Sequence, residues 1–391
     1  QKSSPTVCEN PDKTVQVSKV ATCTCGNHTV ETETIKRDVV SIEIIVHTTQ
    51  YVGKKTKCPC CGKEYMPKFP ENVNNVLNYD EKVKSLMVFL NTYCNVPNRK
   101  VKELFSFLSD GKINIAQATV LNTVKQFSNK SKNILKSIKK NLLKKPVINE
   151  DETPIDVNGK QNSAIGIFTK DLTLIEAFVN RKLESFEEMG ILDRYIGTVC
   201  HDHNNIHKSF VQSKQAECNF HILRYCKAEY EVHKRESIKD VMNYLLELNE
   251  VVEREKAEGK TRVTVEEYEE YKNKYLELLD AWDKEFTDNV RNKNSKYYQS
   301  ERNLKARMRE YVDDHLRFLT DFRIDFTNNL AERGLRKIKG KLKVMGTFRS
   351  LESAKYYCGA ISIIDTAIKQ KLNIGNTIKN IFKGQKKIFA F

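Results

Sequence analysis

Three acidic residues occupy positions from which they could hold divalent metal ions. Asp151 lies within a predicted strand, Asp202 at the carboxyl end of another, and Glu332 on a late basic helix. Mg²⁺ and Mn²⁺ prefer oxygen ligands, and two such ions about 4 Å apart stabilise both the attacking and the leaving oxygen of a phosphoryl displacement. We therefore predict that these carboxylates bind two Mg²⁺ or Mn²⁺ ions and support phosphodiester cleavage.

Glu332 is the single acid in the segment NNLAERGLRKIKGKLK, residues 328–343. As a helix, this segment and the residues after it would form one apolar arc from Leu330, Ala331, Gly334, Leu335, Ile338, Leu342 and Met345. Glu332 falls outside that arc, and the neighbouring Arg333, Arg336 and Lys339 could grip phosphate. An ion pair between Glu332 and Arg336, worth about 0.2 to 0.5 kcal/mol, explains the same pattern without any chemistry.

A sheet must position these acids. Residues 145–157, 162–170 and 172–180 predict three strands, 182–192 a helix, and 195–202 a fourth strand. This order predicts an α/β fold with a mixed sheet and helices packed on it. Alternation along the first strand puts Glu150 and Glu152 on the face opposite to Asp151, and Asp202 would lie at a strand end, where open sheets bind ligands.

A helical insertion is predicted for residues 226–322, between the first part of this core (146–225) and a C-terminal part (323–391) that carries Glu332. One apolar stripe contains Val241, Leu245, Leu248 and Val252, and a second contains Tyr268, Tyr271, Tyr275, Leu279, Trp282 and Phe286. We expect both stripes to form a core, and not a stacking platform for bases. The basic end, residues 369–391, predicts either a tail that contacts phosphate or a solvated end.

Residues 1–75 predict a small zinc-binding β module. Residues 41–52 have the composition of a strand, and Cys58 and Cys61 have the C-x-x-C spacing with which two thiolates reach one tetrahedral zinc. The predicted ligands are Cys23, Cys25, Cys58 and Cys61. The first two stand one residue closer than such a turn prefers, so His28 or Cys60 could replace one of them.

The remaining cysteines are scattered along the chain. They are Cys8, Cys94, Cys200, Cys218, Cys226 and Cys358. We expect them to be small buried hydrophobes. A total of eleven is odd and cannot close completely into internal disulfides, and the crowding near the N-terminus indicates a metal site in a reducing compartment.

Residues 76–145 predict a helical DNA-binding region with a helix-turn-helix. The break SDGKIN separates two helical segments, and such a pair can place its second helix in a major groove. The exposed side of that helix would offer Gln117, Thr119 and Asn122. A helical hairpin without any contact to DNA fits the same pattern.

The charge of the chain favours a polyanionic partner. Lys and Arg number 66 against 51 Asp and Glu, which gives a net charge of +15. No apolar run approaches the roughly 18 residues that a membrane span needs, and the first residues contain no apolar signal core. We therefore expect a cytoplasmic protein that binds nucleic acid.

Two other chemistries have some support. His201, His203 and His207 surround Asp202 and could suggest a zinc hydrolase, although solvated or supporting histidines are the simpler interpretation. Cys218 and His221 would share one face of a helix as a nucleophile and base, but without an evident third group.

Four ordered segments resemble the transposases of the bacterial insertion-sequence-66 family. They are EDETPIDV, VCHDHNNIHKSF, CNFHILRYCK and NNLAERGLRKIKGKLKVMGTFRSLESAKYYCGAISIIDTA. The resemblance runs from about residue 148 to the C-terminus, and the N-terminal cysteine module resembles the zinc-binding domain of the same family. These transposases belong to the DDE class and have an RNase H-like core.

The resemblance implies roles for particular residues. Asp151, Asp202 and Glu332 would be the catalytic triad, with Cys218 and His221 near the active site. It also implies two Mg²⁺ or Mn²⁺ ions, a structural zinc, and DNA as the partner, both as transposon ends and as target. A homo-oligomer on DNA, accessory proteins encoded by the element, and association with the bacterial nucleoid are further expectations.

Two alternatives from other functional classes remain. The first is a catalytically silent or domesticated DNA-binding protein that uses only the zinc module and the helix-turn-helix. The second is an RNase H-like nuclease specific for DNA structure, without strand transfer.

Overall fold

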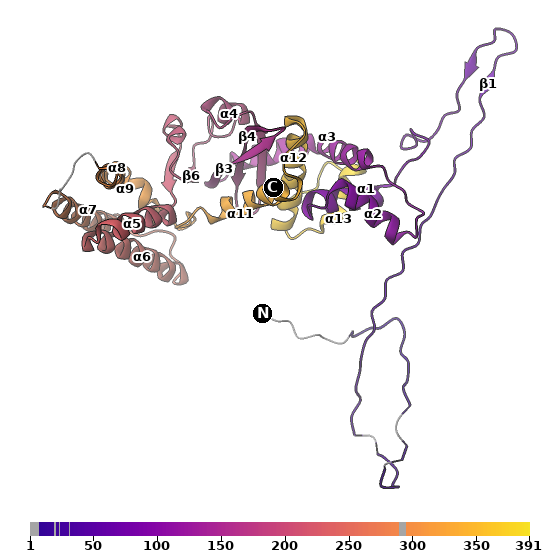
Figure 1. The fold of residues 1–391 in the computed structure, drawn as a ribbon, viewed down its shortest axis with the longest axis horizontal. Helices are drawn as coiled ribbons and strands as arrows, with labels where there is room; N and C mark the ends of the chain where they lie inside the picture. Colours follow the sequence, from indigo (N-terminus) through magenta and orange to yellow (C-terminus); the bar gives the residue numbers. More distant parts are fainter. Residues whose placement is uncertain (1–7, 19–20, 23, 31, 289–294) are drawn as a thin grey trace.

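The structure is a computed structural model that describes residues 8–18, 21–22, 24–30, 32–288 and 295–391. The molecule is elongated (Figure 1). A helical lobe lies at one end, a sheet with its covering helices lies at the centre, and the described residues between 8 and 75 extend away as a long arm. The predicted mixed α/β fold is confirmed.

The central sheet has five strands in the order β5-β4-β3-β6-β7. Their bounds are β3 Val147–Val157, β4 Lys160–Phe168, β5 Thr173–Phe178, β6 Thr198–His201 and β7 Lys214–Glu217. The first three pair antiparallel, whereas β6 is parallel to β3 and β7 is parallel to β6. Four of these strands were predicted from the sequence, and β7 was not.

Helices cover both faces of the sheet. On one face, α11 (Asn329–Met345) crosses β3 and β4, and Ile155 and Val157 of β3 share an apolar cluster with Leu335 and Ile338 of α11. Helices α3 (Gln117–Leu142) and α4 (Leu183–Met189) lie on the other face, in the cluster that contains Ile148. Because side chains alternate along a strand, Asp151 belongs to the α11 face, and Glu150 and Glu152 to the opposite one.

Helix α12 (Leu351–Lys369) runs along the edge strand β5. The hydroxyls of Ser362 and Thr366 accept hydrogen bonds from the backbone N–H groups of Ile175 and Thr173, at 2.8 and 3.1 Å. A free edge would otherwise offer those groups to another chain. Helix α13 (Ile374–Phe382) follows and packs into the main core, so part of the basic C-terminal segment is structural.

The helical lobe covers residues 226–322, for which the sequence predicts helices, and already begins at Asn219. It contains α5 Asn219–His233, α6 Glu236–Ala257, α7 Val265–Asp288, α8 Lys296–Glu310, and the short α9 Val312–His315 and α10 Arg317–Thr320. The two apolar stripes pack against each other, and Trp282 and Tyr275 are fully buried. Cys200 of β6 and Ala216 of β7 belong to the same cluster. The lobe therefore shares a core with the edge of the sheet.

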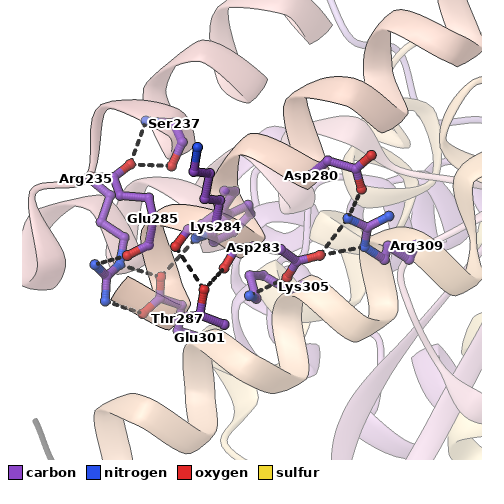
Figure 2. A network of polar contacts seen from close by, with 11 residues as sticks. Arg235, Ser237, Asp280, Asp283, Lys284, Glu285, Thr287, Glu301, Lys305 and Arg309 are labelled. Carbon is purple, nitrogen blue, oxygen red and sulfur yellow. Dashed lines mark hydrogen bonds and ion pairs between the residues drawn. The ribbon is translucent and has the colours of Figure 1, made fainter. Parts of the chain in front are cut away.

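A polar network also joins these helices (Figure 2). Glu301 of α8 is completely buried and accepts hydrogen bonds from Arg235 Nε and Trp282 Nε1, each at 2.8 Å. Arg235 also donates to the backbone oxygen of Glu285 at 3.1 Å. The network thus ties the α5–α6 junction to α7 and α8.

The helices before the sheet are α1 Glu81–Val88, a π-helical turn Phe89–Tyr93, α2 Asn98–Leu108 and α3. Gln117 and Asn122 on α3 are exposed, and Thr119 is half-buried. Further along α3, Phe127 and Ile138 enter the main core beneath the sheet. The exposed side of α3 continues beyond its first turns and includes Lys125, Lys132 and Lys136.

The expected strand at residues 41–52 is absent. The described part of the arm contains the short hairpin of β1 (Thr56–Lys57) and β2 (Glu64–Tyr65) and an isolated bridge between Thr22 and His28, and Ile42 and Ile45 are exposed. A strand needs a ladder of backbone hydrogen bonds, and none joins residues 41–52 to another described segment. That prediction was wrong because strand composition alone does not supply a partner.

The scattered cysteines divide into two groups. Cys200, Cys218, Cys226 and Cys358 are buried as predicted, whereas Cys8 and Cys94 are exposed. Cys8 lies in the arm, away from any core, and Cys94 directly follows the π-helical turn. In the described part of the chain, no helix is both long and apolar enough to cross a membrane.

Candidate active site

The pairing of β3 with β6 brings Asp151 and Asp202 together. The parallel register pairs Val147 with Thr198 and Asn149 with Cys200. If the same register is extended by two residues, Asp151 lies beside Asp202. Asp202 comes directly after β6, at its carboxyl end. Two carboxylates separated by 51 residues in sequence are thus neighbours on the adjacent strands β3 and β6.

Asp151 lies in a strongly acidic environment. Burial is the main cause that raises the pKa of Asp151 to about 8, and the carboxylates of Glu150 and Asp202 add to this effect. The backbone N–H of Glu152 donates to Asp151 Oδ1 at 2.8 Å but does not offset this effect. A divalent cation between these carboxylates would favour their ionised forms, so the donor set suits a metal ion.

The start of α5 brings Cys218 and His221 to the same place. Cys218 is the N-cap of α5, and its backbone N–H donates to the oxygen of His201 at 3.0 Å, next to Asp202. His221 Nδ1 lies 3.0 Å from Asp202 Oδ1. The contact with Asp202 is the main cause that raises the pKa of His221 to about 10, and the contact with Cys218 adds to it. The ring is therefore protonated at neutral pH.

The first turn of α11 adds Glu332. The residue before the helix, Asn328, is completely buried and fixes its position. The Asn328 side chain donates to the backbone oxygen of Glu150 at 2.7 Å and accepts from Asn149 Nδ2 at 3.0 Å. The backbone N–H of Asn328 donates to Cys218 Sγ at 3.2 Å. This one residue joins β3, α5 and α11.

Four potential ligand atoms meet at this junction. One atom each from Asp202, Cys218, His221 and Glu332 lies within 4.8 Å of all the others. Asp151 is outside this group of four, although it lies beside Asp202 on the same face. Asp202 Oδ1 faces the protonated ring of His221, so it already carries one charged contact within this group.

Helix α11 approaches the sheet closely because Gly334 has no side chain. A Cβ atom there would lie 2.6 and 2.7 Å from Phe168 Cζ and Cδ1, and closer still to Cε1. The Phe168 ring is fully buried on β4 and also occupies the space above Gly166. The contact sets the depth of α11, and Glu332 is only two residues away.

Gly334→Ala is therefore expected to push α11 from the sheet. Overpacking costs about 1 to 3 kcal/mol, and DNA cleavage should fall because Glu332 moves with the helix. Gly340→Ala is the matched control, since its nearest neighbour would be Asn95 Nδ2 at 3.4 Å. The control should be neutral or gain up to about 1 kcal/mol from helix propensity. Equal urea midpoints and equal cleavage for the two variants would contradict the prediction.

The cations around Glu332 have different environments. Arg333, Arg336 and Lys339 are exposed, as phosphate contacts require. No ion pair joins Glu332 to Arg336 in the part of the chain that the structure describes, so the simpler account of this segment is not supported. Lys341 is buried, donates to the oxygen of Asn91 at 2.6 Å, and has its pKa lowered by burial to about 8.

The histidines around Asp202 do not converge on one point. His203 Nδ1 lies 2.5 Å from Glu217, His207 Nε2 lies 2.8 Å from Glu150, and the rings of His201 and His207 stack at 3.7 Å. Burial lowers the pKa of both stacked rings to about 3, so both are neutral. His201 Nδ1 also lies 2.6 Å from the backbone oxygen of Asp202. These histidines support the Asp202 loop, and the zinc-hydrolase interpretation loses its basis.

Cys25, Cys58 and Cys61, the predicted zinc ligands that the structure describes, lie in the arm, far from this junction. Cys58 begins a turn in which the Gly62 N–H donates to the Cys58 oxygen at 2.9 Å. The backbone N–H of Cys61, and then that of Cys60, lowers the pKa of the Cys58 thiol, which favours the thiolate that zinc binds. Cys25 is exposed, and Cys23 lies outside the described residues.

Sequence reasoning missed Asn149 and Asn328, which hold the junction together. Asn328 directly precedes a predicted helix, and asparagine is a preferred residue there, so its position was a usable signal. Its contacts with β3 and Cys218 could not be read from the sequence because they join segments more than 100 residues apart.

The strand order, the acids that β3, β6 and α11 bring close together, and the basic side of α11 are typical of an α/β protein that acts on a phosphate-rich polymer. The chain matches the sequence profile of the transposase IS66 family over residues 88–356. This match covers more than half of the chain, which therefore belongs to that family and is a DNA-binding, nucleic-acid-processing protein. A search of curated proteins finds no match.

Proposed function

We propose that this protein is a DDE transposase that cuts DNA at the ends of an insertion sequence and joins those ends to target DNA. The observation that carries the proposal is the junction of Asp202, Cys218, His221 and Glu332 beside Asp151. Asp202 and Glu332 are 130 residues apart in the chain, and their approach at the start of a basic helix supports a shared site for metal ions and phosphate.

An RNase H-like core agrees with the strand arrangement. Three antiparallel strands are followed by two parallel ones, with the acids on the central strand and at the carboxyl end of its parallel neighbour. The proposed domains are 1–75 for zinc binding, 76–145 for DNA binding, 146–225 and 323–391 for the core, and 226–322 for the insertion.

Asp151, Asp202 and Glu332 would hold two Mg²⁺ or Mn²⁺ ions. Such ions, when bound, stabilise charge on the attacking and leaving oxygens of an in-line displacement. Arg333, Arg336 and Lys339 would orient the DNA backbone from the exposed side of α11. His221 would hold Asp202 in place through its charged contact.

The proposed reaction has two steps. In the first, a water oxygen bonds to phosphorus, the P–O3′ bond breaks, and the released 3′-oxygen gains a proton. In the second, that 3′-hydroxyl oxygen bonds to a phosphorus of target DNA, the P–O3′ bond of the target breaks, and the proton lost by the attacking hydroxyl is balanced by one gained by the released target 3′-oxygen. A nuclease would perform only the first step, so joined products distinguish the two.

The test is cleavage of labelled DNA that carries the ends of the element, with Mg²⁺, with Mn²⁺ and with EDTA. Cleavage should require the metal and should fall by about 10³-fold or more in Asp151→Asn, because several kcal/mol of transition-state stabilisation are lost. Tight DNA binding without cleavage by the wild type under any of these conditions would contradict the proposal.

We also propose that the arm binds one structural zinc through Cys58 and Cys61, with Cys23 and Cys25 as the other ligands. Metal analysis should find one zinc per chain, which is lost in the double variant Cys58→Ser/Cys61→Ser. Cys94→Ser is the control, because Cys94 is exposed but far along the chain from this turn. Wild-type protein without zinc would refute the assignment.

DNA recognition would use the first turns of α3, where Gln117, Thr119 and Asn122 face outward or nearly so. A homo-oligomer on DNA, accessory proteins of the same element and a place in the bacterial nucleoid complete the proposal.

A further inference from the structure

A large cavity lies at the amino ends of β6 and β7, the ends opposite to the one that Asp202 follows. It has a volume of about 880 Å³ and is bounded by the β4–β5 turn, the starts of β6 and β7, the loop between α6 and α7, and residues 317–324. The seven cationic side chains that line it are Lys170, Lys214, Lys256, Lys260, Arg262, Arg317 and Arg323. Asp321 is the single carboxylate in the lining.

Three of the seven cations form no ion pair with an acid of the described residues. Asp321 pairs with Arg323 at 2.7 Å, and acids outside the lining pair with Lys256, Lys260 and Arg317. Lys170, Lys214 and Arg262 are exposed and form no ion pair with any described residue. Like charges gathered around one hollow repel each other, and a bound polyanion would relieve that repulsion.

The other lining groups suit phosphate. The hydroxyls of Thr198, Thr261 and Thr320 border the cavity, and threonine hydroxyls commonly contact phosphate oxygens. Phe322 and Ile324 also border it and are buried, so residues of the apolar core support this part of the wall. The volume is far larger than one phosphate requires.

A second hollow of about 380 Å³ lies nearer to the candidate active site. It shares the lining residue Lys256 with the first hollow and is also lined by Asn329 and Arg333, at the start of α11. Arg333 is the neighbour of Glu332. Glu253 and Asp325 also line this second hollow, so its charge is mixed. An extended polyanion that passes Lys256 would contact both hollows, whereas a small ion would contact one.

We propose that this cavity binds the phosphodiester backbone of DNA at a distance from the bond that is cut. The inference rests on the proposed function to the extent that both sites would hold the same DNA. The cavity adds a backbone contact on the insertion side of the sheet, separate from the contacts offered by α3 and α11.

The test compares two triple variants with the same change in charge. Lys170→Ala/Lys214→Ala/Arg262→Ala removes the unpaired cations of the cavity. Lys227→Ala/Lys284→Ala/Arg302→Ala removes exposed cations of the insertion that line neither hollow. Affinity for a fluorescent DNA duplex is measured by anisotropy over a range of KCl concentrations, in EDTA so that no cleavage occurs.

The cavity variant should bind DNA about tenfold or more weakly than the wild type, and the slope of log K against log salt should fall by about 2 to 3. The control variant should change neither value appreciably. Tryptophan fluorescence of Trp282 and circular dichroism should match the wild type in both, since all six side chains are exposed.

Equal loss of affinity in the two variants would overturn the proposal, because only total charge would then matter. Tripolyphosphate is titrated into wild type and cavity variant in parallel. Binding of tripolyphosphate that the cavity variant loses, together with unchanged DNA affinity, would also overturn it and indicate a site for a small anion. Weaker DNA binding by the cavity variant alone would support the inference even if the wild type failed to cut DNA, so the two proposals can fail separately.

Discussion

Replacing Glu332 with glutamine is expected to lower the rate of DNA cleavage by about 10³-fold or more and to leave DNA binding intact. Glutamine keeps the shape of the side chain but removes its negative charge. Glu332 lies within 4.8 Å of ligand atoms from Asp202, Cys218 and His221, so the loss falls at the centre of the junction.

DNA affinity should stay the same or rise slightly in this variant. Arg333, Arg336 and Lys339 remain, and removing one acid among them makes the first half of α11 more attractive to phosphate. The position beside the positive end of a helix dipole also tolerates a neutral amide. The effect is thus expected on cleavage, and not on binding.

The measurement is single-turnover cleavage with saturating enzyme, together with anisotropy for affinity. Glu266→Gln is the matched control, because Glu266 is an exposed glutamate in the first turn of α7 and should behave as the wild type. Mn²⁺ bound per chain, followed by electron paramagnetic resonance, should fall in Glu332→Gln alone. Normal cleavage by Glu332→Gln would remove this residue from the catalytic assignment.

The geometry refines what the three acids can do. Asp202 and Glu332 meet directly, whereas Asp151 approaches from the neighbouring strand and is not one of the four clustered groups. Cys218 and His221 lie beside both acids, and the protonated ring of His221 balances charge next to Asp202. Carboxylate oxygens bind both Mg²⁺ and Mn²⁺, so the comparison of the two metals is informative.

The strands β3 to β6 could be predicted because each has a distinct run of β-branched residues bounded by turn signals. β7, with the sequence KQAE, has no such run. Its place in the sheet depends on pairing with β6 and on the core that Ala216 shares with the insertion. A short polar strand of this kind is determined by tertiary contacts, which a local pattern does not contain.

Helix α11 shows the same limit on a smaller scale. The apolar arc predicted Ala331, Leu335 and Ile338 correctly as buried, but Met345 at the end of the arc is largely exposed. Lys341, which the pattern treats as a surface charge, is buried against Asn91 and Tyr357. A long side chain can cover apolar surface while its amine finds a carbonyl, and periodicity does not reveal that choice.

The largest effect on stability is expected for Glu301→Ala. The change leaves the charge of Arg235 buried and removes its main partner, which costs about 3 to 5 kcal/mol. The Trp282 N–H also loses its acceptor (Figure 2 shows the network around Arg235). Because Trp282 is the single tryptophan of the chain, its fluorescence reports the unfolding of the insertion directly.

The measurement is the urea midpoint of that fluorescence transition. Glu236→Ala is the control, because Glu236 pairs with Lys239 on the surface, and such pairs contribute about 0 to 1 kcal/mol. The double variant Arg235→Met/Glu301→Leu should recover much of the loss, since apolar side chains of similar size can replace a buried ion pair. Equal midpoints for Glu301→Ala and Glu236→Ala would show that the network does not stabilise the insertion.

Unfolding of the insertion should also affect the candidate active site, because the insertion shares an apolar core with the sheet. Cys200 of β6 and Ala216 of β7 pack in the same cluster as Trp282, and Asp202 follows β6 by one residue. Unfolding of the insertion would therefore expose the edge of the sheet that positions Asp202. Cleavage by Glu301→Ala should decline with rising temperature in parallel with the Trp282 signal, whereas cleavage by Glu332→Gln should be absent at every temperature. The two variants separate loss of the scaffold from loss of the chemistry.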